Sequence, residues 1–401
     1  MFNVLIEALQ RTPVEDQRVE LVERKGRGHP DSICDAIAEE VSQALCREYL
    51  AGVGRILHHN VDKGLLVAGR TEPRLGGGKV LEPMRLVLGD RATADYKGRH
   101  FKVAEIAESS ARNWIRRNLR YVDPDRHLIF QGELKEGSPE LTDLFERETI
   151  GANDTSAAVG YAPLTETENL VLAAERYLNS VEFKKRFPQA GEDVKVMAFR
   201  RDRHLLLTVA VAFVDRFVGD AGTYFARKEE MRLALEEYLA QQQRTLDRIS
   251  VHLNTLDDPA RGEGGMYLTV LGTSAEGGDC GEVGRGNRVN GIISMNRPMS
   301  AEAAAGKNPV SHVGKIYSVL SHQLAAQVHA EVPGLREVYI LLCSQIGQPI
   351  DKPMIAAAQI VPLPGVDLAE VRQRVEAIVR NGLAAIPSLG IQLARGERPL
   401  W

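Results

Sequence analysis

Apolar residues recur every four positions in one early stretch of the chain, which is the spacing of one face of an α-helix. The residues of this face are Ile33, Ile37, Val41, Leu45 and Tyr49. Pro30 suits the first helical position, and Gly52 is the expected end of this helix, whose periodic part is Ile33–Leu50. The same kind of spacing predicts five further helices, over Val103–Arg120, Glu166–Asn179, Ala226–Arg244, Val310–Glu331 and Leu368–Asn381.

Strand-like apolar runs often occur in pairs ahead of a predicted helix. The predicted strands are Arg18–Arg24, Ile56–Val61, Leu65–Gly69, Met84–Leu88, His127–Gln131, Val194–Phe199, Leu205–Asp215, Ser250–Thr255, Met266–Gly272, Glu337–Ser344 and Met354–Pro362. Paired strands followed by a helix indicate an α+β fold with mainly antiparallel sheets, not a doubly wound parallel sheet. These elements fit three similar α/β units. We place the unit boundaries near 148 and 275, which gives units 1–148, 149–275 and 276–401 with soft edges.

Length and charge narrow the class of protein. A chain of 401 residues is long enough for two or three domains, and 44% hydrophobic residues are ordinary for a globular protein. A net charge of −4 provides no overall attraction to nucleic acid or to a membrane, so an anion-binding site must be local. The longest apolar run, Leu205–Val214, is far shorter than the roughly 20 residues that span a bilayer. It predicts a buried strand.

The four cysteines, Cys34, Cys46, Cys280 and Cys343, lack the C-x-x-C spacing that is typical of zinc sites. Sparse cysteines in a long chain are typical of a reducing compartment. The start of the chain lacks the basic segment of a signal peptide. We therefore expect a cytoplasmic protein.

The most informative segment is Gly26-Arg27-Gly28-His29-Pro30-Asp31-Ser32, a glycine-rich turn that leads into the first predicted helix. Glycines let a backbone approach an anion closely, and a helix N-terminus offers free N–H groups to phosphate. His29 could donate to a phosphate oxygen and Asp31 could hold a magnesium ion. Asp35 lies four residues after Asp31 and therefore on the same helix face. The alternative is an ordinary capped helix with His29 as the cap.

A second glycine-rich segment, Gly277–Arg288, follows a predicted strand. Its glycines can expose successive N–H groups to an anion, and Arg285 and Arg288 can bind phosphate. Asp279 could accept a hydrogen bond from a ribose hydroxyl or from a substrate ammonium group. A solvated surface loop is the alternative.

Two shorter segments could also line a ligand site. Lys307, in Gly306–His312, stands near the start of a predicted helix as a point-charge ligand for phosphate, although an exposed loop lysine would look the same. Gly151–Ser156 is small and polar, as a ligand-lining loop or a helix-capping turn would be. The chain contains no GxxxxGK[ST] motif, and its glycine segments match GxGxxG only in part, so a P-loop or dinucleotide fold is not favoured.

Taken together, these segments resemble the S-adenosylmethionine synthetase (methionine adenosyltransferase) family, most closely its archaeal type. The resemblance rests first on Gly28-His29-Pro30-Asp31, on Asp279-Cys280-Gly281 followed by Gly284-Arg285, and on Gly306-Lys307. The archaeal type is matched almost letter for letter by Val22–Asp35, Ala152–Ser156, Gly160–Pro163 and Val283–Gly291. The similarity covers about residues 18–360.

The resemblance implies an enzyme that transfers the adenosyl group of ATP to the sulfur of L-methionine and then cleaves the released triphosphate. It implies magnesium as a cofactor and potassium as a possible activator. The implied fold has three similar α+β units with interleaved segments. The implied assembly is a homodimer, or a tetramer, in which the sheets of two subunits pack face to face and active sites lie at the interface.

The resemblance also implies roles for particular residues. His29, Arg285 and Lys307 correspond to residues that act on the triphosphate, and Asp31 corresponds to a magnesium ligand. The segment Gly137-Ser138-Pro139-Glu140 resembles a mobile loop that closes over the substrates. The expected ATP- and methionine-binding residues are Gly28, Gly137, Ser138, Asp154, Ser156, Lys195, Asp279, Arg288, Asn308 and His312.

Some positions differ from the bacterial and eukaryotic pattern of the family. Ser32 stands where that pattern has lysine, and acidic Asp193 stands near the place of a basic residue, with Lys195 close by. A second magnesium-binding aspartate has no match after Lys307, where Asn308 and His312 stand nearby. The glutamates expected to contact potassium and methionine have no clear match within residues 60–72.

Two other functions are compatible with a nucleotide-binding chain. One is another ATP-dependent enzyme, such as a kinase or ligase, and the other is a non-catalytic subunit that binds nucleotide to regulate a partner. The reaction products distinguish them, because a kinase leaves ADP whereas an adenosyltransferase leaves phosphate, pyrophosphate and a sulfonium compound.

Overall fold

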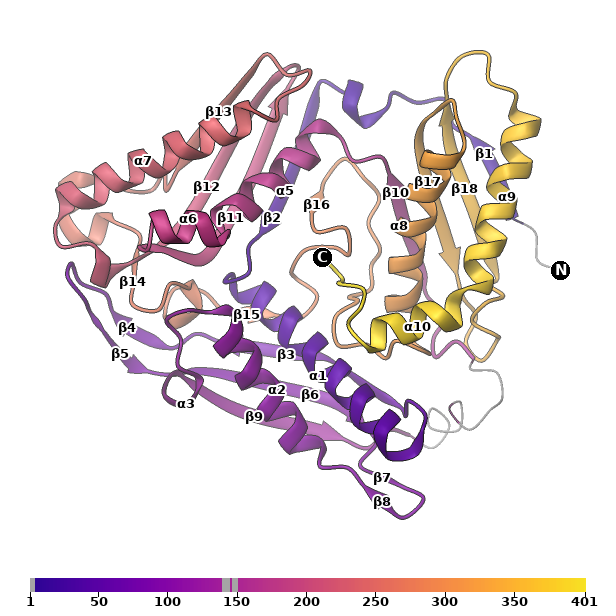
Figure 1. Ribbon diagram of the computed structural model, residues 1–401, viewed down its shortest axis with the longest axis horizontal. Helices are drawn as coiled ribbons and strands as arrows, with labels where there is room; N and C mark the ends of the chain where they lie inside the picture. The colour runs from indigo at the N-terminus through magenta and orange to yellow at the C-terminus, as the bar shows by residue number, and fades with distance from the viewer. Residues whose placement is uncertain (1–3, 139–144, 146–150) are drawn as a thin grey trace.

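The computed structural model of the protein describes residues 4–138, 145 and 151–401. Its secondary structure is organised around three main sheets, each covered on one face by helices, as Figure 1 shows, and two small two-stranded sheets accompany them. Each sheet has its own cluster of buried apolar side chains between strands and helices. The expected α+β fold with mainly antiparallel sheets is confirmed.

One sheet has the strand order β15-β3-β6-β9 and packs against helices α1 and α2. Its elements are α1 (Pro30–Val53), β3 (His59–Val67), β6 (Met84–Ala92), α2 (Val103–Asn118), β9 (Leu128–Lys135) and β15 (Gly281–Glu282). β3 pairs antiparallel with β6 and with β15, whereas β9 runs parallel to β6.

A second sheet has the order β13-β12-β11-β2-β16 and packs against α5 and α7. Its elements are β2 (Val19–Lys25), α5 (Glu166–Leu178), β11 (Ala190–Arg201), β12 (His204–Val214), α7 (Ala221–Ala240), β13 (Arg248–Leu253), β14 (Leu268–Thr269) and β16 (Ile293–Ser294). β14 pairs with β12 beside the main path of the sheet.

The third sheet has the order β1-β18-β17-β10 and packs against α8 and α9. Its elements are β1 (Val4–Ala8), β10 (Ala157–Ala162), α8 (Val313–Glu331), β17 (Leu335–Cys343), β18 (Ile355–Pro362) and α9 (Leu368–Ala384). Among the described residues the shorter elements are β4 (Arg70–Glu72), β5 (Lys79–Glu82), β7 (Asp95–Tyr96), β8 (Arg99–His100), α3 (Pro124–His127), α6 (Val181–Arg186) and α10 (Ile386–Ala394), with four 3-10 turns.

The three sheets share one plan. A helix leads into an antiparallel pair of strands, a second helix follows, and a further strand runs parallel to the second strand of the pair. The parallel strand is β9 in the first sheet, β13 in the second and β1 in the third. A fourth strand pairs antiparallel with the first strand of the pair, and it is β15, β2 and β10 in the same order. The chain therefore repeats a structural unit three times.

The units exchange segments. β1 and β2 come first in sequence, yet β1 pairs with β18 and β2 pairs with β11 and β16. Near the other end of the chain, β15 completes the sheet of β3. The unit boundaries near 148 and 275 remain a prediction, and these strands cross them.

All six predicted helices are confirmed, although several ends differ: α7 spans Ala221–Ala240 and not 226–244, and α8 begins at Val313 and not at 310. Helix α1 continues through Gly52 and ends at Gly54, which adopts the left-handed conformation (φ 73°) of a helix C-cap. The predicted strands Ile56–Val61 and Leu65–Gly69 are parts of one strand, β3, and only Leu268–Thr269 of Met266–Gly272 forms a strand.

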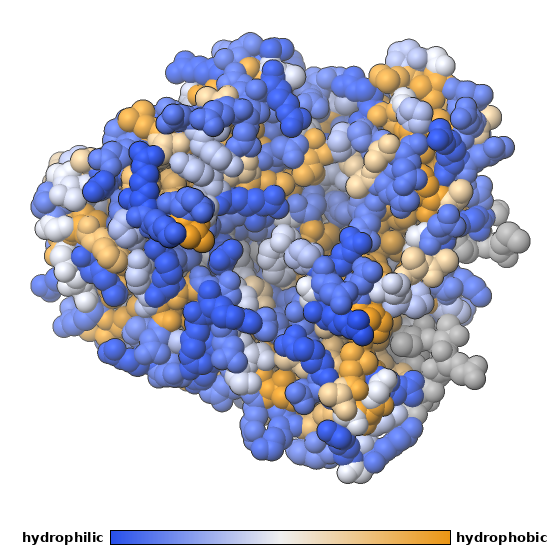
Figure 2. Space-filling view, viewed as in Figure 1, coloured by the Kyte–Doolittle hydropathy of each residue, from blue (hydrophilic) through white to orange (hydrophobic). Residues whose placement is uncertain are grey.

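The sheet faces away from the helices carry exposed apolar side chains. Leu65 on β3, Phe199 on β11 and Leu5 on β1 have exposed fractions of 44%, 39% and 61%. The view from the helix side is mostly hydrophilic, with scattered apolar residues (Figure 2). Among the described residues no single helix is long and apolar enough to cross a membrane, and only α9 and α10 together, bent by 52°, reach that length.

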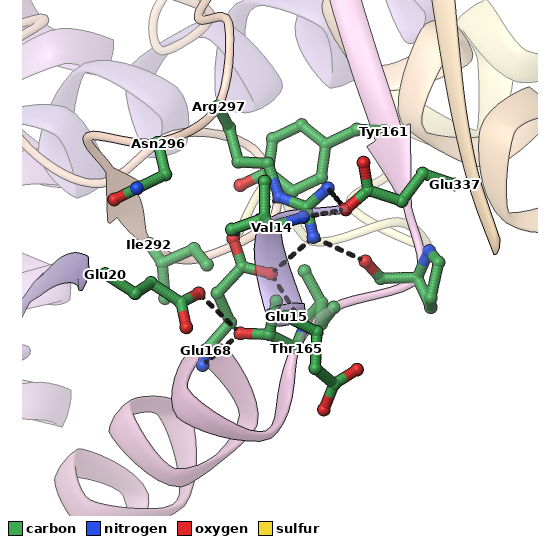
Figure 3. A network of polar contacts seen from close by, with 12 residues as sticks. Val14, Glu15, Glu20, Tyr161, Thr165, Glu168, Ile292, Asn296, Arg297 and Glu337 are labelled. Atoms are coloured by element: carbon green, nitrogen blue, oxygen red, sulfur yellow. Dashed lines mark hydrogen bonds and ion pairs between the residues drawn. The ribbon is translucent and has the colours of Figure 1, made fainter. Parts of the chain in front are cut away.

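A buried ionic network joins the second and third sheets (Figure 3). Arg297 lies between Glu168 of α5 and Glu337 of β17, at 3.3 and 3.0 Å. Its guanidinium also donates to the Tyr339 hydroxyl at 2.7 Å and lies over the Tyr161 ring. All three charged side chains have exposed fractions of 3% or less, so the network fixes how the two sheets meet.

Candidate active site

His29 is the N-cap residue of helix α1, directly before Pro30. Its Nδ1 atom accepts a hydrogen bond from the Asp31 N–H at 3.2 Å. Burial lowers the pKa of His29 to about 4. The nearby charges of Lys25 and Lys195 act in the same direction, and the charge of Asp31 acts against it. The imidazole is therefore neutral at pH 7, and with Nδ1 accepting, its proton sits on Nε2, ready to be donated.

The backbone around Gly28 holds His29 in place. The Gly28 N–H donates to the Glu192 carbonyl at 2.9 Å, and the Gly28 carbonyl accepts from the Thr273 hydroxyl at 2.7 Å. A Cβ atom at Gly28 would lie 2.4 Å from the Glu192 backbone, so only glycine fits this close approach.

His29 opens into a cleft of about 830 Å³, which we call the His29 cleft. Lys195 and Asp279, two of the expected binding residues, line the same cleft. Much of the remaining wall is apolar or aromatic, from Met197, Val209, Leu256, Met266 and Tyr267. A cleft with an apolar wall and a few charged groups suits a ligand that has both a ring system and charges.

Asp193 is a buried carboxylate that lines the His29 cleft. It accepts hydrogen bonds from the Ser274 N–H at 2.8 Å and from the Ser274 hydroxyl at 2.5 Å. Burial raises the pKa of Asp193 to about 6. The acidic residue that departs from the expected basic pattern thus holds the start of the segment that carries Asp279.

Asp31 is engaged through both carboxylate oxygens. Oδ1 accepts from the Glu282 N–H at 3.0 Å, and Oδ2 pairs with the Lys25 ammonium at 2.8 Å. Among the described residues, no group of three or more His, Cys, Asp or Glu side chains is arranged to hold a metal ion. A single carboxylate beside a phosphate site still fits magnesium, which is usually held by one or two carboxylates plus phosphate oxygens.

A second cleft, of about 550 Å³, contains Lys307 and Arg285, and we call it the Lys307 cleft. The segment Gly277–Arg288 connects the two clefts, because Asp279 lines the first and Glu282 and Arg285 line the second. The two clefts, which this segment connects, are lined by five of the expected residues: His29, Lys195, Asp279, Arg285 and Lys307.

Lys307 is buried and already paired. Its ammonium contacts the Asp62 carboxylate and lies 3.1 Å from Glu302. Although burial acts in the opposite direction, the Lys307 charge lowers the pKa of Asp62. Asn60 bridges Asp62 and Asp90 through its amide group, at 2.9 and 3.0 Å.

Among the expected binding residues that line neither cleft, three have side chains engaged with other partners. The Arg288 guanidinium donates to the Gly284 carbonyl and faces a separate internal cavity. Asn308 is buried and donates to the Leu57 carbonyl at 3.0 Å. His312 is the N-cap of α8, and burial lowers the pKa of this histidine to about 3.

The remaining expected residues lie near the start of α8 and the end of β9. Asn153, beside Asp154, bonds to the backbone of Ser311 and Val313, and Ser156 bonds to Ser344. At the end of β9, Gly137 lies against His58, and Ser138 follows it. Pro139 and Glu140 lie outside the described residues. Neither Asp154, Ser156, Gly137 nor Ser138 lines the two clefts within one chain.

Sequence reasoning missed several residues of the two clefts. Asp62 and Glu302 gave no signal, because they meet Lys307 only after folding. Tyr267 and Ser274 stand just before the Gly277–Arg288 segment, and their place beside that motif was the signal that could have identified them.

Comparisons with known proteins identify a family for the chain. The family model for S-adenosylmethionine synthetase (AdoMet synthetase) matches residues 2–397. S-adenosylmethionine synthases from Pyrococcus furiosus and Methanothermobacter thermautotrophicus are 48% and 45% identical to the chain. The first alignment covers 96% of each chain and the second 99%.

A solved structure has a similar fold. The structure described as an unusual S-adenosylmethionine synthetase from Campylobacter jejuni superposes with a TM-score of 0.62 at 15% identity, covering 96% of this chain and 95% of that one. Sequence similarity over almost the whole length is what establishes kinship: this chain belongs to the S-adenosylmethionine synthetase family.

Proposed function

We propose that the chain is a methionine adenosyltransferase, which makes S-adenosylmethionine from ATP and L-methionine. Membership of the family over nearly the whole chain carries this conclusion. The two adjoining clefts support it, because they combine an apolar wall with His29, Lys195, Arg285 and Lys307.

The reaction needs positioning and charge stabilisation. A sulfur lone pair of methionine forms a bond to C5′ of ATP, the C5′–O bond breaks, and its electron pair leaves with triphosphate. No proton has to move in this displacement, so in-line alignment and stabilisation of the departing oxygen supply the catalysis. Hydrolysis of triphosphate follows at the same site: water adds to one phosphorus, a P–O–P bond breaks, and pyrophosphate and phosphate are released.

His29 is the proposed donor to the departing oxygen. It is neutral, buried and held with Nε2–H free, beside the first turn of α1. Arg285 and Lys307 are the proposed phosphate ligands. Because Lys307 is paired with Asp62 and Glu302 in the single chain, phosphate has to compete with these carboxylates for it.

Asp31 is the proposed magnesium ligand. A bound magnesium ion would neutralise negative charge on the phosphates. The ion pair with Lys25 at 2.8 Å holds the carboxylate in place beside the proposed phosphate site. We propose potassium as an activator without assigning residues to it, and the cytoplasm as the compartment.

The active unit is proposed to be a homodimer. The open faces of the three sheets expose apolar side chains that a second subunit would cover. Gly137, Ser138, Asp154 and Ser156, which line neither cleft of their own chain, are then candidates to complete the site of the partner.

The decisive experiment is product identification. The purified chain is incubated with ATP, L-methionine and Mg²⁺, and products are identified by mass spectrometry and phosphate analysis. S-adenosylmethionine, pyrophosphate and phosphate are expected in equal amounts, and omission of methionine or Mg²⁺ should stop formation of the sulfonium product. ADP as the main product would instead identify a kinase or ligase, and unchanged ATP would identify a non-catalytic subunit.

A further inference from the structure

The segment that carries Arg285 lies against the first two turns of helix α1. Three alternate backbone N–H groups, those of Glu282, Gly284 and Gly286, donate to carboxylates of that helix. Glu282 donates to Asp31, and the two glycines donate to Asp35. The expected placement of both carboxylates on one helix face is confirmed, and the face serves as a docking strip for the segment.

Asp35 makes two of these bonds at once. Its Oδ1 accepts from Gly284 at 2.7 Å and its Oδ2 from Gly286 at 3.1 Å, and the residue is 4% exposed. Arg285 lies between the two glycines, so its backbone is fixed on both sides. The Arg285 side chain itself is 70% exposed and lines the Lys307 cleft.

The two glycines are matched to this arrangement. Gly284 has a φ of 88°, a conformation that other residues rarely adopt. A Cβ atom at Gly286 would lie 2.1 Å from the Asp35 carboxylate. Any side chain at residue 286 would therefore have to displace either the carboxylate or the segment.

We propose that Asp35 is a positioning residue for the phosphate ligand Arg285. Its carboxylate clamps the turn at Gly284–Gly286 and thereby fixes where the Arg285 guanidinium can meet the nucleotide. Asp35 touches no substrate in this arrangement and acts only through the segment that it holds. The inference rests on the proposed function for the role of Arg285.

The first test replaces Asp35 with Asn. Asn offers one acceptor oxygen and turns an NH₂ group toward the second N–H, so one clamp bond is lost and two donors face each other. Assays at pH 8 keep the wild-type carboxylate ionised, because burial raises the pKa of Asp35 to about 7. We expect the KM for ATP to rise at least about tenfold, and the KM for methionine to change less than about twofold.

Glu166→Gln is the matched control. Glu166 likewise accepts two backbone N–H bonds, from Arg244 and Thr245, but at a turn that lines neither cleft. We expect Glu166→Gln to lose about as much thermal stability as Asp35→Asn and to keep an unchanged KM for ATP. If the two variants have the same KM for ATP, the proposal is wrong.

A cycle with Arg285→Ala tests whether Asp35 acts through Arg285. If it does, adding Asp35→Asn to Arg285→Ala should lower kcat/KM for ATP by less than about threefold further. Independent effects would multiply, giving a further loss of about tenfold, and would contradict the proposal. Binding of a non-hydrolysable ATP analogue with Mg²⁺, measured by calorimetry, should follow the same pattern.

Gly286→Ala keeps the test decisive if Asp35→Asn does not fold. The added methyl pushes the segment off Asp35, so the same selective rise in the KM for ATP is expected, and a normal KM would refute the clamp. An inactive wild-type protein would instead count against the proposed function, whereas an active wild type with unaffected variants would count against the clamp alone.

Discussion

At the residue scale, His29 combines a fixed tautomer with a low pKa. The Asp31 N–H occupies Nδ1, and burial keeps the ring neutral, so Nε2 is a donor throughout the range in which the enzyme would work. A neutral donor stabilises a departing oxygen without attracting solvent anions. The two properties follow from the N-cap position and from the burial of the turn.

We expect His29→Asn to slow formation of the sulfonium product by about 100- to 1,000-fold. Loss of one preorganised donor in such a site costs about 2.7–4 kcal/mol. Cleavage of added triphosphate breaks a different bond and should fall much less. Single-turnover rates for both half-reactions measure the difference, and equal losses in the two would contradict the role of His29 in the displacement.

A second histidine, His322 of α8, makes folding sensitive to acid. Its Nδ1 accepts from the Tyr161 N–H at 3.3 Å, and burial lowers the pKa of His322 to about 4. The unfolded chain takes up a proton near pH 6.5, and the folded protein does so only near pH 4. Between these values the unfolded state binds more protons, so stability falls as the pH falls.

His322→Asn should remove this acid sensitivity, because the amide oxygen can replace Nδ1 as the acceptor and does not titrate. Relative to the variant, the wild type is expected to lose about 3 kcal/mol of unfolding free energy between pH 7 and pH 4. Urea unfolding of both proteins at several pH values and one protein concentration measures the difference. A constant difference across that range would show that His322 does not titrate as proposed.

Single residues were predictable where a sequence motif contained them. Residues that come together only in the folded chain were missed. The Gly-His-Pro-Asp motif located the start of α1, with His29 as its cap, because a helix start can be read locally. The pairing of Lys307 with Asp62 joins residues 245 positions apart and has no local signal. Arg288 and Asn308 stand in the right segments, yet their side chains turn to internal partners.

At the element scale, helix α1 shows which signals are local. Its start at Pro30 was predicted from Pro30 and the acidic first turn. The predicted end was wrong because both Gly52 and Gly54 are possible helix ends in the sequence. Phe101 packs against Gly52, where a Cβ would lie 2.7 Å from the ring. Tertiary packing thus makes Gly52 part of the helix, and Gly54 becomes the cap.

Gly54→Ala should destabilise the protein by about 1–2 kcal/mol, the cost of a left-handed conformation for a residue with a Cβ. Nothing lies within 4 Å of the added methyl, so the effect is purely conformational. Gly219→Ala is the control, since that site is equally open and has no positive φ, and its stability should not fall. Chemical denaturation compares the two, and equal effects would contradict the cap.

Strand β10 was missed for a related reason. Its sequence, Ala-Ala-Val-Gly-Tyr-Ala, is poor in the branched and aromatic residues that mark strands. A Cβ at Gly160 would lie 2.1 Å from the backbone of His322, so α8 packs directly on the strand. That contact requires small residues, and a run of small residues lacks the pattern that predicts a strand.

At the scale of the whole molecule, Arg297 joins the second sheet to the third. Removing one member of a buried ion pair leaves the other charges unpaired, which typically costs about 3–5 kcal/mol. We expect that loss in the unfolding free energy of Arg297→Met. Arg203→Met, which breaks an exposed pair with Asp247, should change stability by less than about 1 kcal/mol. Comparable losses in both variants would contradict the role of the network.

The exposed apolar sheet faces predict that activity requires assembly. Phe199→Glu should place a charge in the interface, give monomers in sedimentation and abolish turnover. Val181→Glu alters an equally apolar but helix-side position, 63% exposed on α6, and should leave assembly and activity intact. Dilution of the wild type to the monomer should also stop turnover, and an active monomer would refute the shared site.

The three-unit plan was predictable from the order of strands and helices, whereas the exchange of strands between units was not. β1 was not predicted as a strand and β2 directly precedes α1, so sequence order alone placed both segments in the first unit. Both strands pair with strands of the other two sheets, whose free edges exist only after those units have formed.

The pairing of β1 with β18 also imposes an order on protein synthesis. Val4 lies opposite Ala356, so 352 residues separate the partners. At about 5–20 residues per second, the ribosome takes about 18–70 s to deliver the second strand after the first. During that interval β1 has no native neighbour, and a nascent chain halted before residue 355 should leave its N-terminal strand open to proteases while the α1–β9 segment is already resistant.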